Sequence, residues 1–199
     1  VFCAGANLKE RPATADEQHA WSRSFGALLS QVMHSPKPVV ARIDGPALAG
    51  GIGLECAVDI SVASDAAVFG LTEVRVGVAP AIVAVVCLPK MTIGTAKELM
   101  LRGNRIAATD AVRLGLVNHA VPTDQLDATV EAVVADLLLA GPNALTATKR
   151  LFSEVASRDE TEAFEWAAQF SAELFISDEG REGMRAFAER RSPSWVRNE

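Results

Sequence analysis

The sequence predicts an α/β fold in which short strands alternate with helices and lead into an all-helical C-terminal third. Short segments rich in β-branched residues, such as Pro38–Ile43 and Asp59–Ala63, alternate with segments of helical spacing, which is typical of crossover connections. From Thr123 onward, apolar residues recur at helical spacing with no strand between them. The 199 residues, of which 49% are hydrophobic, are enough for one domain with a sizeable core.

The N-terminal segments define the first strand, loop and helix. Val1–Cys3 has the pattern of the end of a buried strand, and the polar stretch Lys9–Asp16 predicts a mobile loop. Thr14 or Asp16 can cap the helix that follows. Its apolar positions at helical spacing are Trp21, Phe25, Leu28, Leu29 and Val32. Ser35–Pro38 ends this helix, because proline cannot continue one.

The rest of the chain continues the alternation and then turns helical. The predicted strands are Pro38–Ile43, Asp59–Ala63, Ala67–Phe69 and Val117–Val121. The predicted helices are Gly50–Ala57, Ala81–Leu88, Thr92–Leu101, Thr109–Leu114, a stripe from Leu126 to Leu138, Asn143–Ala156, Glu160–Ile176 and Asp178–Arg191. We expect Thr109 to cap its helix and Gly115 to end it. No linker is long enough to separate two domains, so residues 1–122 are expected to form a core and 123–199 a helical region of the same domain.

Charge and cysteine usage exclude several functions. The net charge of −6, without a run of Lys or Arg, disfavours nucleic acid as a partner. Three single cysteines in apolar surroundings argue against a disulfide framework and for a reducing compartment, here the cytoplasm. The histidines are scattered, so no metal is expected; they are His19, His34 and His119. The longest apolar run, Val76–Leu88, is too short to span a membrane.

Two turns of small residues, Phe2–Asn7 and Pro46–Gly51, are the most informative feature. Neither has a side chain large enough to cover its own backbone N–H groups. Two such donors aimed at one point would form an oxyanion hole for a thioester carbonyl. The alternative is that both are tight turns for close packing. A nucleotide loop is excluded, because no Lys-Ser/Thr follows Gly45–Gly53 and its glycine spacing is wrong.

With Phe69–Glu73 following in the same order, these turns resemble the crotonase, or enoyl-CoA hydratase/isomerase, superfamily. The matching segments are Phe2–Glu10, Lys37–Asp59, Ala67–Pro80, Arg102–Val121 and Glu179–Trp195. The resemblance implies a spiral of strand-strand-helix turns forming two roughly perpendicular sheets, with C-terminal helices that build a trimer, and trimers that commonly pair into hexamers. It also implies that an N-terminal portion is missing before Val1, since the chain opens within a strand.

The resemblance assigns the oxyanion donors to the backbone N–H groups of Ala6 and Gly50. Backbone groups around Ala4, Ala6, Leu8 and Gly50 are implied to hold coenzyme A, which is part of the substrate, so no cofactor is expected. Candidates for phosphate contact are Lys149, Arg150, Arg190 and Arg191. For each of these, a solvated helix face is the alternative.

Many hydratases of the superfamily use two glutamates, whereas this chain keeps one. The position three residues after the oxyanion glycine is Gly53, and the second acid is Glu73. Apolar neighbours should desolvate Glu73 in part and suit it to proton transfer; a solvated loop charge is the alternative. Glu55 lies about 200° around the helix from Gly53, so it is expected to be exposed or paired rather than to replace the missing acid.

Two further departures from the superfamily pattern concern the pocket and the first turn. Bulky apolar residues over Ala81–Leu88 replace glycines close to the acyl pocket and predict a smaller or differently shaped pocket; a buried helix is the alternative. Asn7 stands where aspartate is usual and is expected to hold the turn in the same way.

Three functions are therefore carried forward. The first is an enoyl-CoA hydratase that adds water across a trans-2-enoyl-CoA, with Glu73 as acid and base. The similarity of Gly50–Asp59 and Thr72–Pro80 to a bacterial hydratase branch, which includes enzymes acting on branched glutaconyl-type thioesters, favours it modestly. The second is a Δ3,Δ2-enoyl-CoA isomerase, for which one glutamate is sufficient. The third is a non-catalytic acyl-CoA-binding subunit.

Overall fold

The computed structural model describes residues 1–10 and 13–196 of the chain. Its internal contacts divide the chain into two compact units. The first consists of Val1–Ser35 with Val39–Glu131, and the second of Pro36–Pro38 with Ala132–Glu199. Each unit is described by itself.

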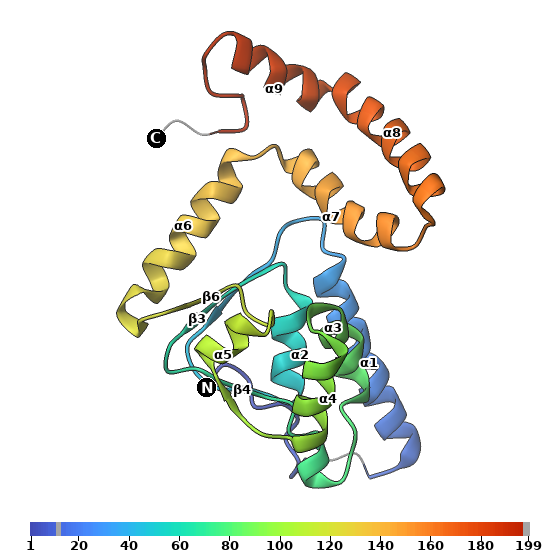
Figure 1. The fold of residues 1–199 in the computed structure, drawn as a ribbon, viewed down its shortest axis with the longest axis vertical. Helices are drawn as coiled ribbons and strands as arrows, with labels where there is room; N and C mark the ends of the chain where they lie inside the picture. Colours follow the sequence, from blue (N-terminus) through green and yellow to red (C-terminus); the bar gives the residue numbers. More distant parts are fainter. Residues whose placement is uncertain (11–12, 197–199) are drawn as a thin grey trace. The chain divides into compact units, whose positions relative to one another are not determined.

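The first unit contains two three-stranded sheets, part of which is labelled in Figure 1. One sheet has the order β1-β3-β6 and is parallel throughout. In the other, β2 pairs with β4 in parallel, and β4 pairs with β5 antiparallel. The strand bounds are β1 Val40–Ile43, β2 Ala47–Leu48, β3 Ile60–Ser64, β4 Val68–Gly70, β5 Ile106–Ala107 and β6 His119–Val121. Parallel pairs joined through helices confirm the predicted α/β class.

The helices of the first unit begin and end close to the predicted positions. Their bounds are α1 Ala15–Met33, α2 Gly50–Ala57, α3 Ala81–Cys87, α4 Ile93–Arg102 and α5 Ala108–Arg113. Thr14 caps α1 in a capping box with Glu17, and Thr92 caps α4. The prediction that Thr109 caps a helix is wrong: α5 begins one residue earlier, and its capping position, Ala107, has no side-chain oxygen. The predicted loop over Lys9–Asp16 includes residues 11–12, which lie outside the described residues.

Helices α1, α2 and α3 pack against one another, with α2 contacting both of the others (Figure 1). The core beneath them is continuous and apolar. Its largest fully buried apolar side chains are Phe69, Ile43, Ile52, Leu71 and Leu116. Because α2 is short and enclosed, its position is set by these contacts rather than by helix propensity.

The second unit is helical, as the sequence predicts for the last third. It contains the end of α6 (Leu126–Leu139), and α7 (Pro142–Ala156), which contacts both α8 (Glu160–Ile176) and α9 (Asp178–Ala188). Arg150 lies over the ring of Phe170, on which Trp166 stacks.

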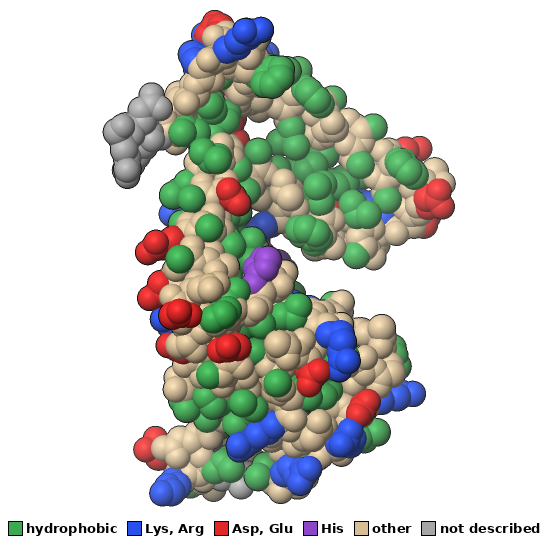
Figure 2. All heavy atoms as spheres, turned by 60° about the vertical axis from the view of Figure 1, so that its left-hand side comes forward, with side chains coloured by type: hydrophobic (Ala, Val, Ile, Leu, Met, Phe, Trp, Pro, Cys, Tyr) green, Lys and Arg blue, Asp and Glu red, His purple; other side chains and the backbone are tan. Residues whose placement is uncertain are grey.

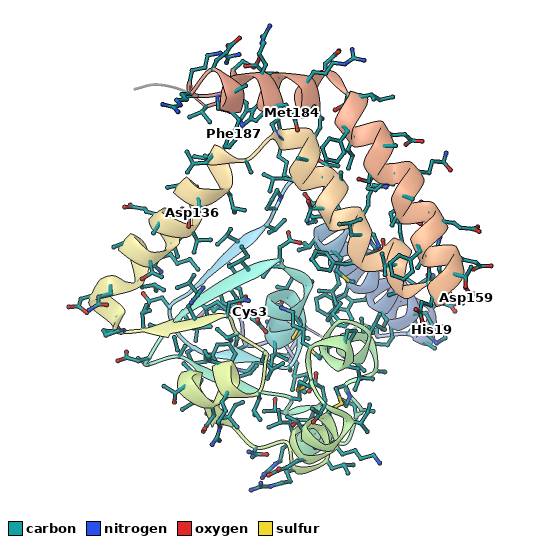
Figure 3. All side chains as sticks on the ribbon, turned by 45° about the horizontal axis from the view of Figure 1, so that its top comes forward. Cys3, His19, Asp136, Asp159, Met184 and Phe187 are labelled. Atoms are coloured by element: carbon teal, nitrogen blue, oxygen red, sulfur yellow. The ribbon has the colours of Figure 1, made fainter. Side chains whose placement is uncertain are left out.

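Many apolar side chains of the second unit stay exposed. Figure 2 shows hydrophobic side chains gathered over the upper part of the molecule, where these helices lie in Figure 1. The large exposed ones include Phe152, Phe164, Phe175, Ile176 and Phe187. Met184 and Phe187 belong to α9 (Figure 3), and Phe187 is 86% exposed. Large apolar groups are thus exposed on several helices of this unit.

Within the described residues, no single helix combines the length and apolar composition that crossing a bilayer requires. One bent pair, Thr123–Leu139 with Pro142–Ala156, meets the length and composition criteria jointly, at an angle of 104°.

Replacing Gly51 by alanine should destabilise the first unit. A Cβ atom at this position would overlap the Cys3 carbonyl oxygen and lie 2.9 Å from the Cys3 Cβ, closer than real atoms approach. Overpacking of this kind costs about 3 kcal/mol of unfolding free energy, to be measured by chemical denaturation. Gly94→Ala is the matched control, since its Cβ would meet nothing nearer than 3.9 Å. That variant should gain about 0.5 kcal/mol, and equal stability of the two variants would contradict the prediction.

Candidate active site

The two small-residue turns lie in contact. Cys3 forms an isolated parallel bridge with Ala47, and the Leu48 N–H donates to the Cys3 carbonyl at 2.9 Å. Cys3 therefore lies beside the start of α2 (Figure 3). Gly5 has a φ of 86°, and a Cβ on it would lie 3.0 Å from the Ala49 Cβ and 3.1 Å from the Gly50 nitrogen. The close approach thus depends on the absence of a side chain at Gly5.

The amide groups predicted as oxyanion donors carry no hydrogen bond to any described residue. The Gly50 N–H is the first of α2, where no intrahelical acceptor exists. The Ala6 N–H likewise has no acceptor in the described part of the chain. Both can donate to a bound group, and the helix terminus favours a group with negative charge.

Ala49, directly before Gly50, is held in an unusual conformation. Its φ of 49° with a ψ of −120° is rare for a residue with a Cβ. Its N–H donates to the Gly70 carbonyl at 2.9 Å, which fixes the turn against β4. Such strain persists only where the surroundings impose it, and it is common at functional sites. Here it sets the direction in which the next amide, that of Gly50, points.

Glu73 lies three residues after Gly70, whose carbonyl accepts the hydrogen bond from Ala49. It begins a 3₁₀ turn, Glu73–Val76, which follows β4 after Leu71 and Thr72. The side chain is half-buried, and its Oε2 is buried with no hydrogen-bond partner among the described residues. Burial raises the pKa of this carboxyl above its ordinary value. A carboxyl group of this kind can accept a proton and return it.

Gly53, one turn into α2, faces an apolar wall. A Cβ on Gly53 would lie 2.5 Å from Val83 Cγ1 and 3.6 Å from Leu29 Cδ1. A Cβ on Gly50 would lie 3.2 Å from Phe25 Cζ. This side of α2 therefore meets three apolar side chains from α1 and α3, and we call Phe25, Leu29 and Val83 the apolar wall. The sequence analysis predicted that bulky residues in the segment of Val83 shape the pocket, but nothing in the sequence indicated that Phe25 and Leu29 reach α2.

Glu55 is fully buried and paired, so the exposed alternative is wrong and the paired one is confirmed. Ser61 Oγ donates to its Oε1 at 3.0 Å, and Lys90 Nζ lies 3.8 Å from the same oxygen. Burial raises the pKa of Glu55, while Lys90 and the hydrogen bonds from Cys56 and Ser61 oppose that rise. These contacts anchor α2 to β3 and to the 3₁₀ turn Leu88–Lys90 that follows α3, and they leave Glu55 committed to structure.

The residues proposed to hold coenzyme A are accessible. Ala4, Ala6 and Leu8 are exposed, as backbone contacts to a large ligand require. Asn7 Oδ1 accepts from the Lys9 N–H at 3.2 Å, which confirms its predicted role in holding the turn. No group of three or more His, Cys, Asp or Glu in the described ranges is arranged to hold a metal ion.

The candidate phosphate-binding cations are partly engaged elsewhere. Arg150 pairs with Glu154, and Arg191 pairs with Glu182 and Glu189. Lys149 Nζ donates to the Lys37 carbonyl at 3.2 Å. These contacts lie within the second unit or at its edge and favour a structural role for the three side chains. Arg190 has a φ of 53° and lies at the end of α9.

Comparison with known proteins identifies the class of enzyme. The family model described as enoyl-CoA hydratase/isomerase matches residues 1–198. The chain therefore belongs to the enoyl-CoA hydratase/isomerase family, whose members act on acyl-CoA thioesters, and it is an enzyme of this kind.

Individual relatives agree. The chain is 35% identical over 200 residues to enoyl-CoA hydratase EchA19 of Mycobacterium tuberculosis, covering 98% of this chain and 75% of that protein. It is 34% identical to the human mitochondrial enoyl-CoA hydratase domain-containing protein 2, covering 98% of this chain and 69% of that one. Among solved structures, Pseudomonas aeruginosa AtuE matches with a TM-score of 0.93 at 34% identity, covering 98% of this chain and 78% of AtuE. The crotonase-like α/β fold predicted from the sequence is thereby confirmed.

Compared with the wild type, the Glu73→Gln variant should become more stable as pH rises. Because burial raises the pKa of Glu73 in the folded state, the wild type loses stability as pH rises from the ordinary value of 4.5 through the raised value. Below pH 4.5 the Glu73 carboxyl is protonated in both the folded and the unfolded state, and its contribution to stability is fully present. Glutamine does not titrate, so the difference in unfolding free energy between variant and wild type should grow from pH 4 to pH 7. Urea denaturation at both pH values measures it, and a difference that shrinks would contradict the assignment.

Proposed function

We propose that the chain is an enoyl-CoA hydratase that adds water across the double bond of a trans-2-enoyl-CoA. One observation carries the proposal: two amides without acceptors in the described chain lie on turns in contact, and Glu73, whose buried Oε2 has no partner among the described residues, follows the strand bonded to one turn. The Ala6 and Gly50 N–H groups would hold the thioester oxygen as negative charge develops on it. Relatives named as hydratases support the same reaction.

The chemistry requires only one carboxyl group. Water loses a proton to the Glu73 carboxylate as its oxygen bonds to C3 of the acyl group. The electron pair of the double bond moves toward the thioester oxygen held by the two amides. Glu73 then gives the proton to C2, so that one water is consumed and the carboxylate is regenerated. Burial raises the pKa of Glu73 above its ordinary value, which makes its carboxylate a better proton acceptor than an exposed one.

A second candidate is a Δ3,Δ2-enoyl-CoA isomerase, favoured by the contact of Gly53 with Val83. In that reaction Glu73 removes a proton from C2 of a 3-enoyl thioester and returns it to C4. The double bond shifts, and no water enters. Isomerisation needs a single carboxyl group to move the proton, so it is compatible with an apolar wall that has no acidic group next to Gly50.

We also propose that the chain self-associates as a trimer or a pair of trimers through the second unit. The exposed side chains of α7, α8 and α9, among them Phe152, Phe164 and Phe187, provide apolar area for such an interface. The acidic net charge and the free cysteines favour a cytoplasmic protein that acts without nucleic acid or membrane.

The purified protein should convert crotonyl-CoA to the 3-hydroxy thioester and incorporate one oxygen from H₂¹⁸O. Loss of enoyl absorbance and product mass spectrometry measure the two events. Glu73→Gln should lower kcat by about 10²–10⁴-fold. A shift of 3-enoyl-CoA without ¹⁸O uptake would make the isomerase correct. Binding of thioesters without turnover of either substrate would make the chain a binding subunit.

Ala6→Pro should lower kcat by about 10²–10³-fold, because proline has no N–H to donate to the oxyanion. Ala6→Gly keeps the donor and serves as the control, with a loss of a few fold at most. Circular dichroism establishes that both variants fold. Equal activity of the two variants would show that the Ala6 amide does not hold the developing charge.

A further inference from the structure

Gly53 and Val83 are tightly fitted to each other, although they are thirty positions apart in sequence. A Cβ on Gly53 would lie 2.5 Å from Val83 Cγ1 and 3.2 Å from Val83 Cβ. Both residues are buried, and Val83 is only 3% exposed. Val83 thus occupies the volume that any side chain at position 53 would need.

This contact lies one helical turn from the proposed oxyanion donor. Residues three apart in a helix share a face, so Gly53 and Gly50 look toward the same side. The Phe25 ring closes that side at Gly50, and Val83 with Leu29 closes it at Gly53. An acyl group whose carbonyl oxygen bonds to the Gly50 N–H would have its first carbons close to this wall.

The wall has no group that can hold or activate water. Its three members are hydrocarbon side chains, whereas the carboxyl next along α2, Glu55, is turned to Ser61 and Lys90. A substituent on the acyl chain is therefore limited by the shape of the wall and not by a hydrogen bond. Pockets of this type discriminate by size, and each methylene is worth roughly tenfold or more in kcat/KM.

We propose that Val83 is a specificity-determining residue. From α3 it fills the space beside Gly53, excludes acyl groups branched near the carbonyl, and leaves Glu73 as the group that moves protons. The inference rests on the proposed function and deepens it, since it concerns which enoyl thioesters the same site accepts.

Val83→Ala tests the proposal, with Val85→Ala as the matched control. Both substitutions remove the same atoms from α3, but Val85 is 70% exposed. The measured quantity is the ratio of kcat/KM for 3-methylcrotonyl-CoA to that for crotonyl-CoA. This ratio does not depend on the fraction of folded enzyme. Val83→Ala should raise it about tenfold and Val85→Ala should leave it unchanged; no change in Val83→Ala, or equal rises in both, would overturn the proposal.

The contact itself is tested without activity. Gly53→Ala should lower the melting temperature, because its methyl group collides with Val83. Gly53→Ala combined with Val83→Ala should melt higher than the sum of the two single shifts predicts. Additive shifts would refute the fit between the residues, and this outcome is readable even in an inactive protein. Failure of the proposed function is a separate result: no thioester is turned over, while the two melting shifts remain non-additive.

Discussion

The site depends on one steric constraint, the approach of the first turn to the start of α2 with no room for side chains between them. Gly5 abuts Ala49 and Gly50, and Gly51 abuts the backbone of Cys3. Hydrogen bonds from Leu48 to Cys3 and from Ala49 to Gly70 hold this arrangement. The amides of Ala6 and Gly50 are left without acceptors in the described chain because the backbone around them is already committed. Packing by glycine thus leaves two amide donors of the kind that the proposed reaction requires.

Two glutamate carboxyl groups, the fully buried Glu55 and the half-buried Glu73, differ in what their surroundings allow them to do. Glu55 accepts hydrogen bonds from Ser61 and Cys56 and lies near Lys90, so its charge is compensated. The buried Oε2 of Glu73 has no such partner in the described residues, and desolvation raises the pKa of this carboxyl more than a hydrogen bond from its own backbone lowers it. A compensated carboxylate stabilises the position of α2, whereas an uncompensated one is available for proton transfer. The sequence placed Glu73 among apolar neighbours, but it gave no means to pair Glu55 with a lysine thirty-five positions away.

Helix bounds and caps were predictable from the sequence where neighbouring residues alone determine them. The bounds of α2 and α8 match the sequence prediction, and the Thr14 cap of α1 follows from side-chain chemistry. The cap at Thr109 was wrong because α5 begins at Ala108, directly after β5, and the antiparallel pairing of β5 with β4 sets that start. The turns at Ala6 and Gly50 were found from residue size, but their mutual contact requires the folded chain. The apolar wall was not predictable, since Phe25 and Val83 reach α2 only through the packing of α1 and α3.

Two departures from the superfamily pattern, separate in sequence, become one feature in three dimensions. Loss of a side chain at position 53 and gain of bulk over Ala81–Leu88 meet at a single contact between Gly53 and Val83. The two positions are coupled: a larger residue at 53 would collide with Val83, and a smaller residue at 83 would leave a cavity beside Leu29. Together the two residues place hydrocarbon, and no polar side chain, one helical turn from the Gly50 amide. In the proposed reaction, Glu73 is then the group that transfers protons, and the shape of the wall selects the acyl group.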